Sequence, residues 1–232
     1  MVVGDGAKGR EGYIQSMFIG HLGLALAAKT AAPRTSLGTL GAAAQWVDLV
    51  WPVLLLAGIE RVRIDPGNTA FTPLDFEHYP WTHSLVMAAV WALAFALAYR
   101  ARTGYARGAA VVGALVASHW LLDVGTHRPD LPLAPWLETR LGLGLWNSVA
   151  ATVVVEGAIF AAGVAAYVRG TRPRDRTGTW SLVALVAFLL AAWVANMAGP
   201  PPPSARAIGF VGLSMWLLVA WMAWADRHRE PR

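Results

Sequence analysis

The stretch AAVVGALVASHWLLDV, residues 109–124, is apolar except for Ser118, His119 and Asp123. Similar apolar runs recur along the chain, and a run of about 18 or more such residues can cross the hydrocarbon core of a bilayer. The 232-residue chain is 56% hydrophobic and only 14% charged, whereas about 25% of the residues in a soluble domain are charged. The sequence therefore predicts an integral membrane protein.

The expected fold is an all-α polytopic membrane helix bundle of six to seven segments. The first segment contains Lys29 and has few apolar residues for a span of about 20 residues, so it either crosses the membrane or forms a re-entrant or interfacial helix. A polar tail at 1–16 precedes a single transmembrane helical domain at 17–226, and a basic tail follows at 227–232. The predicted segments are 17–32, 37–59, 83–100, 109–124, 148–168, 180–198 and 208–225.

Arginines cluster in the short connections at 100–107 and 169–176 and in the C-terminal tail. Cytoplasmic loops of membrane proteins carry such an excess of basic residues. We therefore expect a multi-pass protein of the bacterial inner (cytoplasmic) membrane with a cytoplasmic C-terminus. The connections at 60–81, 125–147 and 199–204 then lie on the outer side.

The net charge of +5 does not indicate nucleic-acid binding, because these arginines adjoin apolar segments and face headgroups and cytoplasm. The chain has no cysteine. Disulfides, thiolate metal sites and cysteine nucleophiles are therefore excluded.

Histidines and carboxylates lie in or beside the apolar segments, with almost no lysine or arginine next to them. An ionisable group costs about 2.5–3.5 kcal/mol at the centre of a membrane helix, so such residues are candidates for function. Acids without basic partners need another positive charge, which a bound metal cation would supply. In the expected topology most of these groups lie at similar depth near the outer face. The set is His21, Asp48, His78, His83, His119, Asp123 and Glu156, with His127 close behind.

His119 and Asp123 are four residues apart and therefore share one helix face. Helix bundles build metal sites from histidines and carboxylates that point inward from several helices. Three carboxylates would nearly balance two divalent cations and a bridging hydroxide, and ligands without sulfur favour zinc, manganese or iron. His21 and Asp48 are also compatible with a hydrogen bond between helices. The remaining ionisable groups are interpreted as loop or surface charges: Glu60, Asp65, Asp75, Glu77, Asp130, Glu138 and His228.

Four short motifs follow one another: GHL at 20–22, QWVD at 45–48, HYPWTHS at 78–84 and SHWLLD at 118–123. Their order and spacing resemble those of the bacterial membrane-bound metal-dependent hydrolase family. That family usually has a second acid in the QWVD segment, where this chain has Gln45. It also has Arg-Gly after the first histidine of the third motif, where this chain has Tyr79 and Pro80.

The ligand order of that family also has a distant likeness to zinc-dependent phospholipase C, a helical enzyme that cleaves phosphodiesters with a cluster of zinc ions. The resemblance implies two or more divalent ions, zinc first. It also implies a role in binding metal or substrate for His78. The implied metal ligands are His21, Asp48, His83, His119 and Asp123, with His127 and Glu156 as additions.

We therefore expect a membrane metal-dependent hydrolase that cleaves a phosphoester of a phospholipid or lipid-linked phosphate at the outer face. Metal ions would lower the pKa of a bound water, and Asp48 or Glu156 would act as general base. Arg128 and Arg140 lie on the same side and are candidates for holding a phosphate. The expected partners are membrane lipid and a lipid or phosphoester substrate. The sequence does not define an oligomeric state.

Two alternatives stay open at the level of sequence. Buried histidines and acids also form ion paths, so the protein could be a proton- or metal-coupled transporter. Transporters more often show internal repeats and broken helices, and the sequence predicts neither here. The third reading is a non-catalytic membrane protein that keeps a structural metal.

Overall fold

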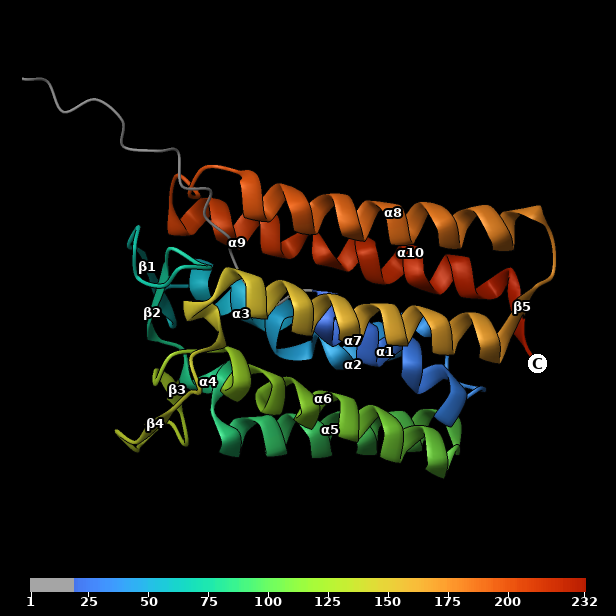
Figure 1. Cartoon of the computed structure of the whole chain (residues 1–232). Helices are drawn as coiled ribbons and strands as arrows, with labels where there is room; N and C mark the ends of the chain where they lie inside the picture. Colours follow the sequence, from blue (N-terminus) through green and yellow to red (C-terminus); the bar gives the residue numbers. More distant parts are fainter. Residues whose placement is uncertain (1–18) are drawn as a thin grey trace, which may run out of the picture.

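The computed structural model describes residues 19–232, so the predicted polar tail at 1–16 lies outside the described residues. The described chain is mostly helical, and its long helices run side by side (Figure 1). Within it, five helices are long and apolar enough to cross a membrane, or six if one bent pair counts as a span. This confirms the all-α polytopic bundle. The five are α5 (Leu85–Thr103), α6 (Ala106–Thr126), α7 (Val149–Gly170), α8 (Arg176–Ala198) and the joined pair α9 (Ala205–Leu213) and α10 (Met215–Arg227).

Helix α1 (Ile19–Ala31) corresponds to the first predicted segment. Its 13 residues extend about 20 Å at 1.5 Å per residue, and it is not among the candidate spans. The helix packs against α7, α6 and the second predicted segment. A Cβ atom on Gly163 of α7 would lie 2.1 Å from the carbonyl oxygen of Gly23, so the two helices approach closely only because both residues are glycine. Helix α1 is therefore an interior element of the bundle.

The second predicted segment, at 37–59, is broken into two helices. Helix α2 (Leu37–Ala44) and helix α3 (Trp46–Leu56) meet at Gln45 with a bend of 57°. Gln45 has φ −107° and ψ 15°, which interrupts the ladder of hydrogen bonds along the helix. The expectation of unbroken helices was wrong here, because a break of one residue leaves the apolar pattern of a segment unchanged.

Three small antiparallel sheets, which the sequence did not predict, cap the ends of the bundle in the described chain. Two of them lie at the end that carries the long connections, together with the short helix α4 (Pro80–His83) and the 3-10 helix η1 (Leu145–Asn147) (Figure 1). The third, at the opposite end, ties the basic tail to the α7–α8 connection. The pairs are β1 (Arg61–Ile64) with β2 (Leu74–His78), β3 (Leu131–Pro132) with β4 (Arg140–Leu141), and β5 (Thr171–Pro173) with β6 (Arg229–Pro231).

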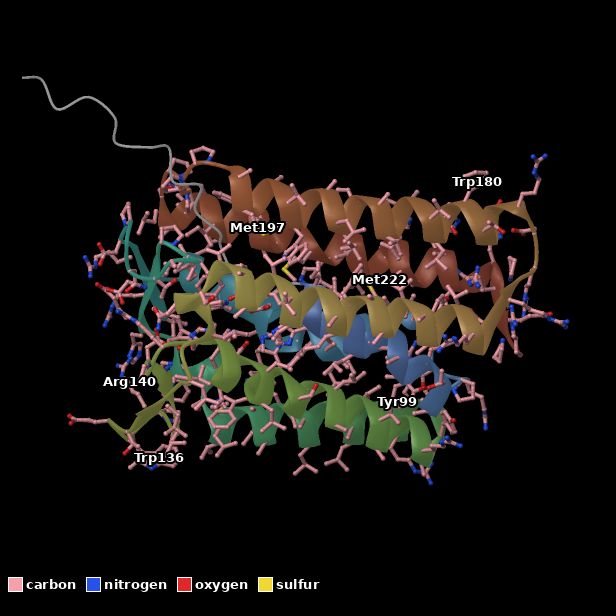
Figure 2. The ribbon with its side chains drawn as sticks, viewed as in Figure 1. Tyr99, Trp136, Arg140, Trp180, Met197 and Met222 are labelled. Carbon is pink, nitrogen blue, oxygen red and sulfur yellow. The ribbon has the colours of Figure 1, made fainter. Side chains whose placement is uncertain are left out.

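The two ends of the bundle differ in charge. The basic connections gather at the end that holds the C-terminus (Figure 1), where the Arg34 guanidinium lies 4.7 Å from the centre of the Tyr105 ring. Figure 2 shows Trp136 near the opposite end and Trp180 near this one, and both are largely exposed. Exposed tryptophans at both ends match the aromatic belts of membrane proteins. The side of the membrane that each end faces stays a prediction.

Candidate metal centre

Five of the predicted ligands converge from four helices near the end of the long connections. Four of them are buried, whereas Asp48 is half-buried. Asp48 lies in the first turn of α3 and His83 ends α4, while His119 and Asp123 share one face of α6 and His21 lies in the first turn of α1. Residues that are up to 102 positions apart in the numbering (21 to 123) are thus brought together by tertiary packing.

The ligand atoms form two groups that share His119. One group is His21, His119 and Asp123, and the other is Asp48, His83 and His119. Within each group the nitrogen and oxygen atoms lie within 4.8 Å of one another. The Nε2 atom of His119 lies 3.3 Å from Oδ2 of Asp123 and 3.6 Å from Oδ2 of Asp48. Both groups use the same Nε2 atom of His119, so this histidine could ligate an ion in one group at a time.

The other two histidines complete the cluster from opposite sides. The Nε2 atom of His83 lies 3.2 Å from Oδ1 of Asp48 and 4.0 Å from Oδ2 of Asp123. The Nε2 atom of His21 lies 3.2 Å from Oδ1 of Asp123, and its ring stacks on that of His119 with the centroids 3.8 Å apart. Each carboxylate therefore faces at least two imidazole rings.

The break at Gln45 positions one of these rings. In a continuous helix the carbonyl of Ala44 would accept the amide of Asp48, four residues on. The interrupted helix leaves this carbonyl available, and it lies 2.7 Å from Nδ1 of His119. Because a carbonyl only accepts, Nδ1 carries a proton, and the Nε2 atom points at the carboxylates. Metal-binding histidines are oriented in the same way.

Glu60 orients the second ring through Thr82. The Thr82 hydroxyl donates to Oε2 of Glu60 at 2.7 Å, so it accepts from Nδ1 of His83, also at 2.7 Å. The Nε2 atom of His83 then faces the cluster and lies within hydrogen-bond distance of Oδ1 of Asp48. Glu60 further accepts the backbone amides of Trp81 and Thr82. Burial raises the pKa of the Glu60 carboxyl, although His83 and the Thr82 hydrogen bonds oppose the change.

Glu60 was interpreted from sequence as a loop charge, yet only 1% of its surface is exposed. It lies 22 residues before Thr82, so no local pattern joins them. Thr82 itself directly precedes His83 in the HYPWTHS motif. That adjacency was the one signal in the sequence that could have assigned Thr82 a role in orienting His83.

The chemistry of the cluster fits a divalent cation. Neither ring nitrogen of His21 and not the Oδ2 atom of Asp123 has a hydrogen-bond partner in the chain from 19 onward. Buried polar atoms almost always have one. No lysine or arginine among residues 19–232 forms an ion pair with Asp48 or Asp123. Nitrogen and oxygen ligands without sulfur suit zinc, manganese or iron.

The remaining predicted ligands lie outside both groups. The Nδ1 atom of His127 is 2.9 Å from Oδ1 of Asp130, and the side chain lines the cavity described below. Glu156 is fully buried on the face of α7 that packs against α1. His78 is partly exposed at the end of β2, opposite Arg61. Their proposed contacts with metal or substrate stay predictions.

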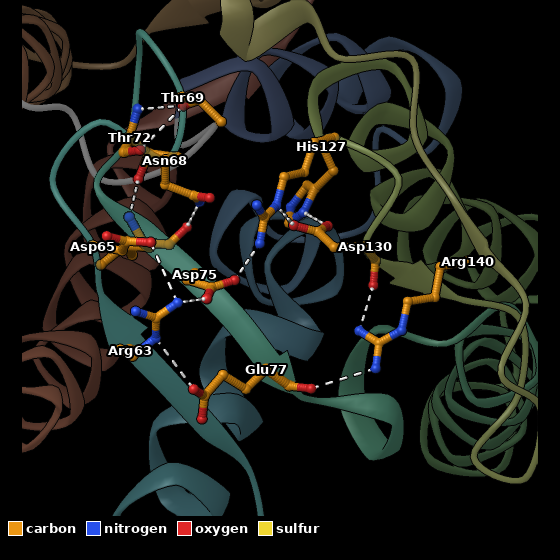
Figure 3. A network of polar contacts seen from close by, with 12 residues as sticks. Arg63, Asp65, Asn68, Thr69, Thr72, Asp75, Glu77, His127, Asp130 and Arg140 are labelled. Atoms are coloured by element: carbon orange, nitrogen blue, oxygen red, sulfur yellow. Dashed lines mark hydrogen bonds and ion pairs between the residues drawn. The ribbon is translucent and has the colours of Figure 1, made fainter.

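The two arginines expected to hold phosphate lie in a polar network of the connections at the same end of the bundle as the ligand groups. Arg140 donates to the carbonyl oxygens of Asp130 and Glu77, at 3.2 and 3.4 Å (Figure 3). Arg128 forms ion pairs with Asp75 and with Asp130. Both guanidinium groups therefore have protein partners that stabilise the loop layer. Phosphate binding by them stays a prediction.

A cavity of about 380 Å³ opens beside the two groups. Asp48, His83, His119, Asp123 and His127 line its polar end. Aromatic side chains from α3, β2 and η1 flank this end, and apolar side chains from α8, α9 and α10 line the rest. The cluster is therefore accessible to a molecule in the cavity.

A family model described as YdjM inner membrane protein matches residues 17–199. The chain belongs to the YdjM inner membrane protein family. The match includes both ligand groups and Glu156, and it confirms a bacterial inner membrane protein. The finer resemblance to metal-dependent hydrolases and to phospholipase C stays a prediction. No curated protein and no solved structure matches the chain significantly.

Proposed function

We propose that this YdjM family member is a metal-dependent hydrolase that cleaves a phosphoester of a phospholipid or lipid-linked phosphate. One observation carries the proposal, namely the two ligand groups that share His119 beside a cavity. Hydrogen bonds to the Ala44 carbonyl and the Thr82 hydroxyl turn the Nε2 atoms of His119 and His83 toward the carboxylates. Such outer hydrogen bonds fix the orientation of metal-binding histidines.

The proposed cofactor is a pair of divalent ions, zinc first, with manganese or iron as alternatives. His21 and Asp123 would hold one ion and Asp48 and His83 the other, with the single Nε2 lone pair of His119 available to either. When bound, such ions lower the pKa of a water toward neutrality and polarise a phosphoryl oxygen.

Asp48 is the stronger candidate for the general base. Its side chain is 22% exposed, against 4% for Asp123, and it lines the cavity. A carboxylate at the cavity wall can accept a proton from a water beside the substrate. Glu156 is fully buried and does not line this cavity, so its proposed place is behind the site.

The expected orientation places this site at the outer face. His119 and Asp123 lie in the last two turns of α6, at the end of the bundle opposite the basic connections (Figure 1). Basic connections favour the cytoplasmic side, so the cluster would lie at the depth of outer headgroups. The phosphoester of a membrane lipid lies at that depth without leaving the bilayer.

A coupled transporter is the second candidate, and the broken span at Gln45 favours it, because transporters build ion sites at discontinuous helices. Against it, the buried polar groups do not form a path along α1. Three buried apolar residues, Leu22, Ala25 and Leu26, separate His21 from Lys29, the next ionisable residue of that helix.

Elemental analysis of the purified full-length protein tests the proposal. We expect bound divalent metal in the wild type and its loss in His119→Ala and Asp123→Ala. His228→Ala is the matched control, because His228 pairs with Asp175 at the opposite end. The metal-containing protein should release phosphate or headgroup from phospholipid vesicles, and a chelator should stop the release.

Three outcomes would contradict the hydrolase. The first is folded protein without divalent metal. The second is bound metal without turnover of any phospholipid or lipid phosphate, which would indicate a structural metal. The third is movement of metal or protons across vesicles without hydrolysis, which would indicate transport.

A further inference from the structure

We propose that an acyl chain of a phosphate-bearing lipid occupies the cavity between α3 and α8–α10, with its headgroup at the two ligand groups. This inference rests on the proposed function and names the substrate as a lipid held by its chain. A volume of about 380 Å³ falls within the range of small-molecule sites.

The polarity of the cavity changes from one end to the other. Four ionisable side chains from α3, α4 and α6, together with His127 just after α6, form one end. The walls from α8, α9 and α10 are apolar except for Asn196 and Ser214, with Phe188, Ile208, Leu218 and Trp221 among them. A soluble phosphoester would leave these apolar walls in contact with water, whereas an acyl chain would cover them.

The apolar part of the cavity reaches the outside of the bundle. Three of its lining residues are largely exposed, because Leu217 is 75%, Val211 67% and Phe188 50% accessible. They lie on helices that are candidate membrane spans, so this opening faces the hydrocarbon core. A lipid could therefore enter sideways from the bilayer, chain first along the wall, without passing through water.

A close contact between α3 and α9 forms part of the cavity wall. A Cβ atom on Gly212 would lie 2.4 Å from Cγ of Pro52, so glycine holds α9 directly against α3. The helix is interrupted just afterwards, at Ser214. Ser214 and Met215 then line the cavity.

Photocrosslinking tests the location of the chain. The probe is phosphatidic acid with a diazirine near the end of one acyl chain, in phosphatidylcholine vesicles that contain the full-length protein. We expect adducts on α8 and α10 residues that line the cavity, and excess unlabelled phosphatidic acid should suppress them. Leu93 on α5, which is 60% exposed, reports contact with bulk lipid that excess lipid does not saturate.

A matched pair of variants tests whether the acyl chain needs the volume of the cavity. Ala192 lines the cavity, whereas its neighbour Ala191 is exposed and does not line it. Ala192→Trp should lower the yield of cavity adducts several-fold and should keep its bound metal. Ala191→Trp should behave as the wild type. If the Ala192→Trp protein is unstable, the positions and the saturation of the wild-type adducts still test the proposal.

The two proposals fail in different ways. Adducts at the same yield inside the cavity and on Leu93, or cavity adducts unchanged in Ala192→Trp, would overturn the acyl-chain site. Hydrolysis of a soluble phosphoester such as p-nitrophenyl phosphate would still support the hydrolase in that case. Saturable cavity adducts without any hydrolysis would keep the lipid site and overturn the hydrolase.

Discussion

Two of the buried clusters of charged groups among residues 19–232 are balanced in different ways. At the basic end, Nζ of Lys29 lies 2.6 Å from Oδ2 of Asp226 and donates to the Thr35 carbonyl at 2.9 Å. Tyr167 donates to the other oxygen of Asp226 at 2.8 Å, and the Leu37 amide donates to Oδ2 at 3.0 Å. This cluster contains both signs of charge, and each oxygen of the acid has a donor.

The cluster at the opposite end has two carboxylates, three imidazoles and no lysine or arginine ion pair within residues 19–232. Two of its rings turn their Nε2 atoms toward the acids. A buried charge needs a partner, and of these two clusters only the one at the Lys29 end has a lysine or arginine partner among residues 19–232. The difference indicates that the first cluster stabilises the fold, whereas the second is the one that we propose receives a cation.

Removing Lys29 should have the largest effect on stability. Lys29→Met leaves Asp226 buried without its cation, and breaking one side of such a pair costs about 3–5 kcal/mol. We expect this decrease in the free energy of unfolding, measured by chemical denaturation in detergent. Lys29→Met combined with Asp226→Asn should recover most of the loss. A single variant as stable as the wild type would remove the contrast between the clusters.

Removing the metal should have the next largest effect on stability. This effect should depend on the two ligand groups that share His119. A ligand at 100 times its Kd stabilises the folded state by about 2.7 kcal/mol, so a chelator should lower the melting temperature accordingly. His119→Ala should not respond to chelator, and Lys29→Met should respond as fully as the wild type. An equal response in His119→Ala would place the metal elsewhere.

Replacing Glu60 should change the affinity for metal rather than the stability of the fold. Outer hydrogen-bond partners of metal ligands change affinity by about 10–100-fold, and Glu60→Gln weakens the acceptor that holds the Thr82 hydroxyl against His83. We expect weaker zinc binding in a competition titration. Glu77→Gln is the control, because Glu77 is exposed in the loop layer. Unchanged affinity in Glu60→Gln would reduce Glu60 to a loop anchor.

Local sequence patterns predicted much of the fold and part of the candidate site. The apolar runs predicted the long helices because the hydrocarbon core selects them by length and composition alone. The spacing of His119 and Asp123 placed both on one face of α6, since helix periodicity is a local property. The structure brings His21, Asp48 and His83 next to that pair, and their role as metal ligands, which the resemblance implies, stays a prediction.

Long-range contacts decided the rest, because the local pattern is silent about them. The sequence could not show that α1 is a short interior helix or that the segment at 37–59 breaks at Gln45. It also could not show that Glu60 is buried behind Thr82. Periodicity reports which face of a helix is apolar, but not which helix covers it. The sequence alone thus determined a membrane bundle with unpaired acids and histidines, and only tertiary packing decided which of them meet and how their protons are held.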